Sequence, residues 1–168
     1  VGSEMCIRDR NTKDPFDMTQ MPVKYPIGIQ SFEMLRKLAY LYIDKTELIY
    51  NLAMTSKCIF LARPRRFGKS LLISTLEAYF QGKKELFEGL AMEKLEKDWI
   101  KRPVLHIDLN IGKYDTPDSL DKQLEKAVTE WEQLYGTGMA ESTLALRFAG
   151  VVRRACEQTG QRVAILID

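Results

Sequence analysis

Residues 57–70 read KCIFLARPRRFGKS, and this stretch carries the strongest structural signal in the sequence. Residues 57–62 form a nearly continuous apolar run of the length of a buried strand. The proline and glycine within residues 63–68 then predict a loop. Apolar side chains recur at helical spacing over residues 69–80, which predicts a helix. The stretch therefore predicts a strand, a loop and a helix in direct succession.

The loop ends in Gly68, Lys69 and Ser70, the order in which a phosphate-binding (Walker A) loop ends. A glycine lets the backbone approach a phosphate without a Cβ in the way, and the N–H groups at a helix N-terminus point at the anion. We expect Lys69 to reach the β- and γ-phosphates and the Ser70 hydroxyl to bind Mg²⁺. The pattern thus predicts a site for ATP and Mg²⁺.

The start of the loop departs from this pattern. The pattern places a first glycine where this chain has Arg63, and the next residue is Pro64. Proline has no N–H and restricts the residue before it, so this half of the loop lacks a flexible glycine. The second half, which carries the chemistry, is intact. The competing interpretation is a basic turn between a strand and a helix whose charges only face solvent.

A second apolar run, VAILI at residues 163–167, is followed by Asp168. The run predicts a buried parallel strand. A P-loop ATPase needs a carboxylate at the end of a neighbouring strand to hold Mg²⁺, usually through water. We therefore expect Asp168 to be that carboxylate, at the end of the Walker B strand. The glutamate that activates water would be the next residue, so we expect the chain to be truncated inside its domain.

Apolar spacing and capping signals predict the remaining elements. Helices are expected over residues 31–38, from 44, and over 69–80, 116–135 and 142–158, and strands over 57–62, 104–109 and 163–167. In the helix that Asp44 opens, Glu47 predicts a capping box. Leu48 and Leu52 predict its buried face, with Ile49 as a further candidate. Strands alternate with helices along the chain, which favours an α/β fold with a parallel sheet and helices on its faces.

The composition excludes several classes of protein. The chain has 168 residues and 25 Lys and Arg against 23 Asp and Glu, and its net charge of +2 excludes a strongly basic, DNA-coating protein. No apolar run reaches the roughly 18 residues of a transmembrane helix. Three dispersed cysteines and a single histidine, His106, offer no Cys/His metal set and no Ser-His-Asp set. A reducing, cytoplasmic location fits this cysteine usage.

The first 20 residues show no sustained helical or strand period, and Val1 precedes the first methionine. The opening, VGSEMCIRDR, resembles the adapter-derived translation found in assembled environmental sequence. We therefore expect residues 1–20 to be a non-native or disordered leader and residues 21–168 to be the domain. Met21 is the preferred start, and Met18 is the alternative.

Several motifs accompany the loop: PIGIQSF (26–32), YIDKT (42–46), RPRRFGKS (63–70), LEAYF (76–80), GKKELF (82–87) and VLHID (104–108). With them, residues 22–168 resemble the N-terminal part of the bacterial AAA-ATPase-like domain family. These are P-loop proteins that often carry a PD-(D/E)XK nuclease-like domain further on, and an arginine in place of the first loop glycine belongs to their own pattern. The resemblance implies a three-layer P-loop NTPase fold, ATP binding, and coupling to a downstream effector domain in the full-length parent.

The loop motif and the family resemblance together indicate which residues form the nucleotide site. The expected nucleotide contacts are Asp44, Lys45, Arg65, Arg66, Phe67, Gly68, Lys69, Ser70 and Leu71, with Lys69 and Asp168 catalytic and Ser70 and Asp168 at the metal. In related ATPases the segment matching residues 42–45 lies near the adenine; the alternative is an N-capped helix. Arg65 and Arg66 are expected to contact the γ-phosphate or a partner's acidic group, or alternatively to face solvent. Phe67 is expected to pack under the loop.

The strand at residues 104–109 ends in polar groups. Asp108 and Asn110 lie at the strand edge that faces the ligand in open α/β sheets, and a polar sensor role is one interpretation. His106 is read as a hydrogen-bonded core or edge histidine rather than a metal ligand.

Two classes of function remain open from the sequence. The first is an Mg²⁺-dependent ATPase in the full-length parent, with a second copy of the chain left open as the source of an assisting arginine. The second is a nucleotide-gated interaction module that binds ATP without useful turnover. A third interpretation, an α/β domain without nucleotide, requires Lys69 and Ser70 to be accidental. For the 168 residues alone we expect weak nucleotide binding and negligible hydrolysis.

Overall fold

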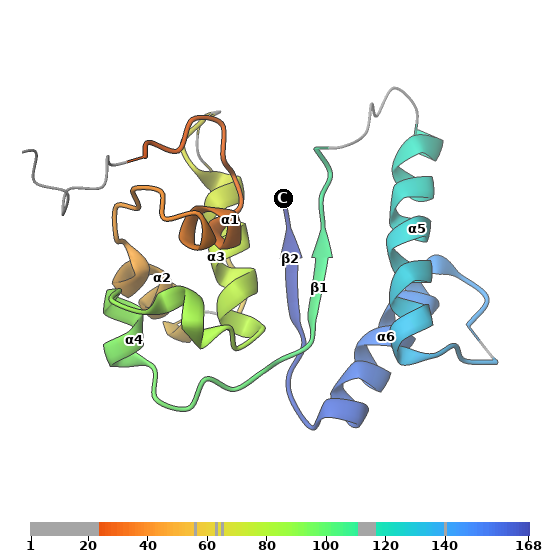
Figure 1. Ribbon diagram of the computed structural model, residues 1–168. Coiled ribbons are helices and arrows are strands. Elements are labelled where there is room, and N and C mark those ends of the chain that lie inside the picture. Colours follow the sequence, from red (N-terminus) through yellow and green to blue (C-terminus); the bar gives the residue numbers. More distant parts are fainter. Residues whose placement is uncertain (1–23, 56, 63, 65, 111–116, 140) are drawn as a thin grey trace, which may run out of the picture.

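The computed structural model describes residues 24–168 except positions 56, 63, 65, 111–116 and 140 (Figure 1). The predicted leader and both candidate start methionines therefore lie outside the described residues. The elements along the chain are α1 (Phe32–Lys37), α2 (Thr46–Thr55), α3 (Lys69–Phe80), the 3₁₀ helix η1 (Lys84–Phe87), α4 (Ala91–Leu95), β1 (Val104–Ile107), α5 (Pro117–Tyr135), α6 (Leu144–Thr159) and β2 (Ala164–Ile167). The predicted mixed α/β class is confirmed. Of the helices described, none is long and apolar enough to cross a membrane.

β1 and β2 form a parallel pair, as their apolar sequences predict. Val104 stands opposite Ala164, and Ile107 stands opposite Ile167. The Asp168 N–H then donates to the Ile107 carbonyl oxygen over 2.9 Å, which extends the pairing past β2. Parallel strands need a crossover connection, and α5 and α6 supply it. Within the described part of the chain the sheet has these two strands, so each strand keeps one edge without a partner strand.

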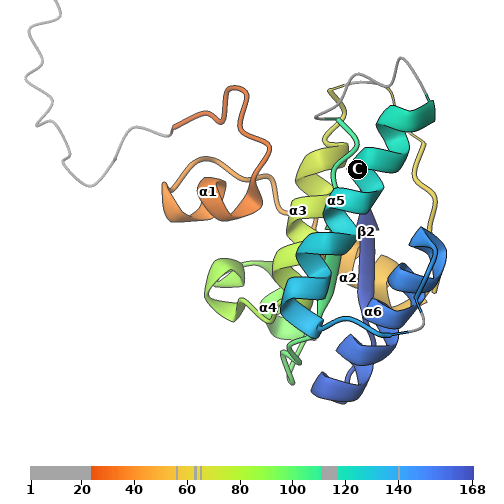
Figure 2. The same cartoon turned by 90° about the vertical axis from the view of Figure 1, so that its right-hand side faces the viewer.

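The sheet lies between two groups of helices, which Figure 1 shows on either side of the strands. α3 packs against both strands from one side and contacts α1 and α2, whereas α5 lies against β1 from the other side with α6 beside it (Figure 2). Side chains alternate between the two faces of a strand. Leu105 and Ile107 accordingly join the α5 side, while Val104 and His106 face α3.

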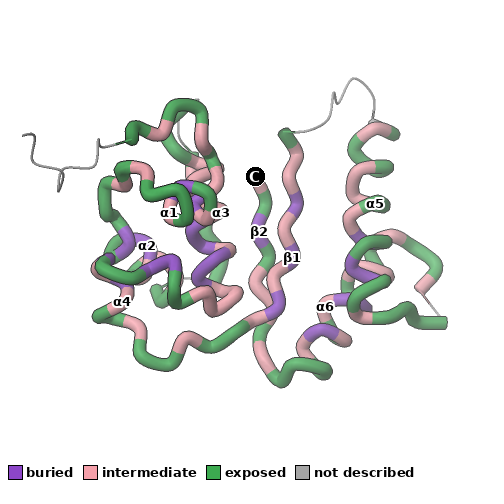
Figure 3. The backbone as a smooth tube through the Cα atoms, in the orientation of Figure 1, coloured by how far each residue is buried: buried purple, intermediate pink, exposed green. Residues whose placement is uncertain are grey.

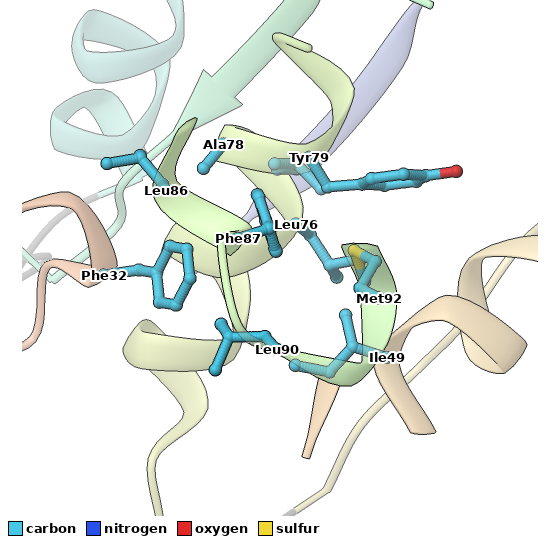
Figure 4. Packing of buried hydrophobic residues seen from close by; sticks show 10 residues of the cluster. Phe32, Ile49, Leu76, Ala78, Tyr79, Leu86, Phe87, Leu90 and Met92 are labelled. Atoms are coloured by element: carbon cyan, nitrogen blue, oxygen red, sulfur yellow. The ribbon is translucent and has the colours of Figure 1, made fainter. Parts of the chain in front are cut away.

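The first hydrophobic core fills the space between α3 and the short helices around it (Figure 4). Its buried members are Phe32, Ile49, Leu76, Ala78, Tyr79, Leu86, Phe87, Leu90, Met92 and Leu166. The rings of Phe32 and Phe87 lie 5.0 Å apart between centroids. Figure 3 shows buried positions where α3, η1 and α4 face one another, with exposed positions on their outer surfaces. The predicted amphipathic helix over residues 69–80 is therefore confirmed, since α3 buries its apolar face in this core.

The second core lies on the other face of the sheet, under α5 and α6. Its buried members are Leu105, Ile107, Val128, Trp131 and Val151. A bidentate pair joins the two helices, since Arg147 donates from Nε and Nη2 to the two carboxylate oxygens of Glu132 over 2.9 and 2.6 Å. This pair holds the pKa of Glu132 below its ordinary value through the hydrogen bonds from Arg147. The predicted amphipathic helices are thus held together by both apolar and charged contacts.

The structure departs from the prediction at residues 57–62, which form no strand. None of these residues is buried, and Phe60 is 92% exposed. A strand is stabilised by hydrogen bonds and side-chain pairs with a neighbouring strand, and apolar composition alone does not supply that neighbour. These residues instead connect α2 to the loop before α3.

The start of α2 also differs from the prediction. The helix begins at Thr46 rather than at Asp44, and its buried residues are Thr46 and Ile49. Leu48, predicted to be buried, is 67% exposed. α2 packs mainly against α4, and the face it turns toward α4 carries Thr46 and Ile49 rather than Leu48. The N-terminal bond runs from the Thr46 N–H to Asp44 Oδ1 over 2.8 Å, and it does not use the predicted Glu47.

Replacing Phe87 with alanine should lower the free energy of unfolding by about 3–5 kcal/mol, because the side chain is fully buried in the first core. Phe60→Ala removes the same atoms from an exposed side chain and should change this free energy by less than about 0.5 kcal/mol. Urea denaturation followed by circular dichroism measures both variants. A loss for Phe60→Ala equal to that for Phe87→Ala would contradict the exposed position of residues 57–62.

Candidate functional site

The loop before α3 has a backbone geometry that favours anion binding. Gly68 is the N-cap of α3 and lies in the left-handed region, with φ 72° and ψ 27°, and Arg66 has φ 69°. Left-handed residues in such loops turn successive N–H groups toward one side and form a concave anion site. A Cβ placed on Gly68 would meet no atom of the described residues within 4 Å, so among these residues the space beside the first turn of α3 is open.

Arg66 adopts its positive φ despite carrying a side chain. This conformation costs on the order of 1 kcal/mol or more for a non-glycine residue. The Arg66 side chain is exposed, so its own burial does not offset the strain. Strained residues of this kind cluster at functional sites. Ala39 and Trp99 also have positive φ, but at Arg66 the strain coincides with the predicted phosphate-binding motif.

The predicted loop residues occupy different environments. Lys69 and Ser70 form the first turn of α3 and are partly buried, and Leu71 packs against the first core. Phe67 is 64% exposed, so the expectation that it packs under the loop is wrong. Arg65 lies outside the described residues.

Asp168 follows β2 directly and is partly buried. Its carbonyl oxygen accepts from the Leu109 N–H over 2.9 Å, which places Asp108 and Asp168 at the same edge of the sheet. Figures 1 and 2 both show this edge, marked by the C label, at the same end of the molecule as the N-terminal end of α3. The fold therefore brings Lys69, Ser70 and Asp168 to one end of the molecule.

Asp44 connects two helix N-termini. Its Oδ1 accepts from the N–H and the hydroxyl of Thr46 over 2.8 and 2.7 Å, and its Oδ2 accepts from the Ala91 N–H over 2.7 Å. The fully buried Thr46 hydroxyl in turn accepts from the Met92 N–H. Burial would raise the pKa of Asp44, but the hydrogen bonds from Thr46 and Ala91 outweigh it and hold the pKa below its ordinary value. The proximity of Asp44 and the exposed Lys45 to the adenine stays a prediction.

Glu77 is a residue near the site that the sequence did not single out. His106 Nδ1 lies 3.1 Å from Glu77 Oε2, which joins β1 to α3 and agrees with a hydrogen-bonded histidine at this strand. The hydrogen bond from His106 holds the pKa of Glu77 below its ordinary value of 4.5. The same bond raises the pKa of His106 above its ordinary value of 6.5. One feature of the sequence could have pointed to Glu77, because it is the one acidic residue among the twelve residues of α3.

Gly68→Ala should lower the free energy of unfolding by about 1–2 kcal/mol, because alanine is strained at positive φ. Gly89→Ala is a matched control, since Gly89 has φ 76° and equally open surroundings at a distant turn. Urea denaturation should give similar losses for both variants. A loss for Gly89→Ala alone would contradict the left-handed geometry of the loop.

The Glu77–His106 pair should contribute most to stability between pH 4.5 and pH 6.5. The glutamate contribution is present above its ordinary pKa and is lost as pH falls through the lowered folded value. The histidine contribution is present below its ordinary pKa and is lost as pH rises through the raised folded value. The measurement is the difference in unfolding free energy between wild type and Glu77→Gln across pH. A difference that does not vary with pH would rule out an ionic contribution of the pair.

Comparison with known proteins identifies the family. Residues 26–168 match the AAA-ATPase-like family, which is described as predicted AAA-ATPases. The uncharacterized protein in the vnfD 5′ region of Azotobacter chroococcum mcd 1 is 37% identical over 147 residues. This match covers 86% of the present chain and 28% of the Azotobacter protein. No solved structure matches the chain. Since the family match covers most of its length, the chain belongs to the AAA-ATPase-like family, whose name implies nucleotide binding.

Proposed function

We propose that this chain binds ATP with Mg²⁺ at the loop before α3, and that the full-length protein hydrolyses the bound ATP. The observation that carries the proposal is Gly68, a left-handed glycine with open space beside it. Lys69 and Ser70 follow it directly, in the first turn of α3. Membership of a family of predicted ATPases supports the choice of a nucleotide as the anion.

The phosphates are bound by the backbone in this proposal. The N–H groups of the first turn of a helix have no carbonyl partner within that helix, and the helix dipole places partial positive charge at this end. The left-handed residues Arg66 and Gly68 shape the loop around an anion. These features bind phosphate groups without regard to the base, so the preference for ATP rests on family membership.

Lys69 supplies a side-chain positive charge to the site. A lysine at this position reaches the β- and γ-phosphates and stabilises the charge that develops as the γ-phosphate is transferred. A cation that acts mainly on this developing charge contributes to the rate as well as to binding. Lys69 is therefore assigned to both roles.

Ser70 and Asp168 are the residues that would hold Mg²⁺. Among the residues that the structure describes, no group of three or more His, Cys, Asp or Glu side chains could hold a metal ion by itself. A serine hydroxyl and an aspartate carboxylate are oxygen donors of the kind that Mg²⁺ takes, and proteins usually bind this ion through one or two carboxylates together with substrate phosphates and water. The bound ion would neutralise charge on the phosphates.

The full-length protein is proposed to couple its nucleotide state to an attached effector domain. The match covers 28% of the Azotobacter relative, so most of that protein lies outside the matched region and has room for an attached domain. In the alternative proposal the module binds ATP and changes state without hydrolysis. Binding in the absence of turnover by the full-length protein would favour this alternative.

Lys69→Ala should raise the Kd for Mg²⁺-ATP by about tenfold or more, the size expected for loss of a charged hydrogen-bonding group. Lys97→Ala is the matched control, because it removes the same charge from an exposed turn after α4. Isothermal titration calorimetry on the full chain, with folding checked by circular dichroism, measures both constants.

Wild-type binding that survives in Lys97→Ala and is weakened in Lys69→Ala would support the nucleotide site. Equal binding in both variants would place the nucleotide elsewhere. A folded wild-type chain that binds no nucleotide would overturn the proposal.

A further inference from the structure

A pair of titratable side chains joins the helix that carries the loop to the sheet. Glu77 of α3 and His106 of β1 are 3.1 Å apart, and each side chain is about 30% exposed. Glu77 Oε1 also accepts from Gln81 Nε2 over 3.1 Å, which holds the carboxylate on the helix surface. His106 Nε2 is buried and has no hydrogen-bond partner within the described residues. The imidazole therefore depends on Glu77 for its polar contact.

The pair lies where it can set the position of the loop. Glu77 is eight residues after Lys69 on α3, which corresponds to about 12 Å along a rigid helix axis. His106 stands opposite Leu166, one position before the last residue of each strand, and Asp108 and Asp168 lie two positions further along. The pair thus links the helix that carries Lys69 to the strands that lead to Asp168.

The other contacts between α3 and the strands are mainly apolar. Leu166 and Val104 pack into the first core with Leu76 and Tyr79. Apolar contacts are non-directional and allow a helix to slide or rotate by small amounts, whereas a hydrogen-bonded ion pair has a preferred geometry. A displacement of about 1 Å between reacting groups can cost two orders of magnitude in rate.

We propose that Glu77 and His106 are positioning residues that fix α3, and with it Lys69 and Ser70, relative to Asp168. This inference rests on the proposed nucleotide site. Neither residue touches the nucleotide in this proposal, and both act through the placement of the helix.

The charge of the pair gives the inference a distinctive pH dependence. The groups that act on His106 are Glu77 from α3, Asp108 from its own strand and Asp168 beyond β2, while Lys83 acts on Glu77. The hydrogen bond that His106 donates to Glu77 raises the pKa of His106, burial opposes this, and the two strand-end carboxylates add to the rise. As pH rises through that pKa the ion pair becomes a hydrogen bond from a neutral imidazole to the Glu77 carboxylate. This bond is weaker than the ion pair, so α3 is held less firmly.

The test compares Mg²⁺-ATP affinity in wild type, Glu77→Gln and His106→Asn, from below pH 6.5 to well above it. Asparagine keeps an N–H donor near the Nδ1 position but does not titrate. Glu125→Gln is the control, since it removes a carboxylate paired with Arg147 on the far helix layer. Dividing each variant's Kd by the wild-type value at the same pH removes the titration of the nucleotide itself.

At the acid end of the range, Glu77→Gln should weaken binding about five- to tenfold, and its ratio to wild type should shrink as pH rises. His106→Asn should bind with a pH dependence flatter than that of wild type. A variant that combines Glu77→Gln with His106→Asn should bind Mg²⁺-ATP no more weakly than Glu77→Gln alone, because the two residues act as one unit. Glu125→Gln should follow the wild-type profile.

Wild-type binding with unchanged pH profiles in both variants would overturn the inference and leave the proposed function standing. A uniform loss in Glu77→Gln with a wild-type profile in His106→Asn would assign the pair a purely structural role and also overturn it. Failure of folded wild-type protein to bind nucleotide would overturn the proposed function and this inference with it. If Glu77→Gln does not fold, the His106→Asn profile decides alone.

Discussion

The pairing of β1 with β2 is the interaction on which the rest of the structure depends. Each hydrophobic core is closed by one face of this small sheet, the first by Val104 and Leu166 and the second by Leu105 and Ile107. The strands are far apart in the sequence, so their pairing carries a loop-closure cost that local contacts do not. Apolar burial on both faces of the sheet offsets that cost.

α3 connects this architecture to the chemistry. Its apolar face contributes Leu76, Ala78 and Tyr79 to the first core, and its first turn carries Lys69 and Ser70. Packing at one end of the helix therefore sets the position of the charged groups at the other end. A substitution in the core would reach the proposed site through the orientation of the helix, even when it leaves the loop itself unchanged.

Local patterns in the sequence predicted the helices and the paired strands well. α3 has the predicted bounds, and the strands ending near Asp108 and Asp168 form where their apolar runs lie. Residues 57–62 have an equally apolar pattern but no partner strand, and pairing is a tertiary property that composition does not contain. Leu48 and Ile49 also show that burial depends on tertiary contacts. Both are apolar and adjacent in the sequence, but Ile49 is buried and Leu48 is exposed because of how α2 packs against α4.

In the candidate site, the sequence predicted the local loop geometry but not the contacts between different elements. The geometry of Gly68 follows from residue type and motif, since glycine is the residue that adopts positive φ without strain. The partnership of Glu77 with His106 joins residues from different elements and could not be read from spacing. In contrast to Gly68, the positive φ of Arg66 could not be predicted, because nothing in an arginine side chain favours a left-handed backbone.

The two tryptophans of the chain lie in different layers of the fold. Trp99 stacks near Tyr79 and Phe87 beside the first core, whereas Trp131 is buried in the second core near Phe148. Each side of the sheet therefore carries its own intrinsic fluorophore. Emission from a chain with a single tryptophan would report on one layer alone, so spectroscopy can tell whether the two layers lose their packing together or in sequence.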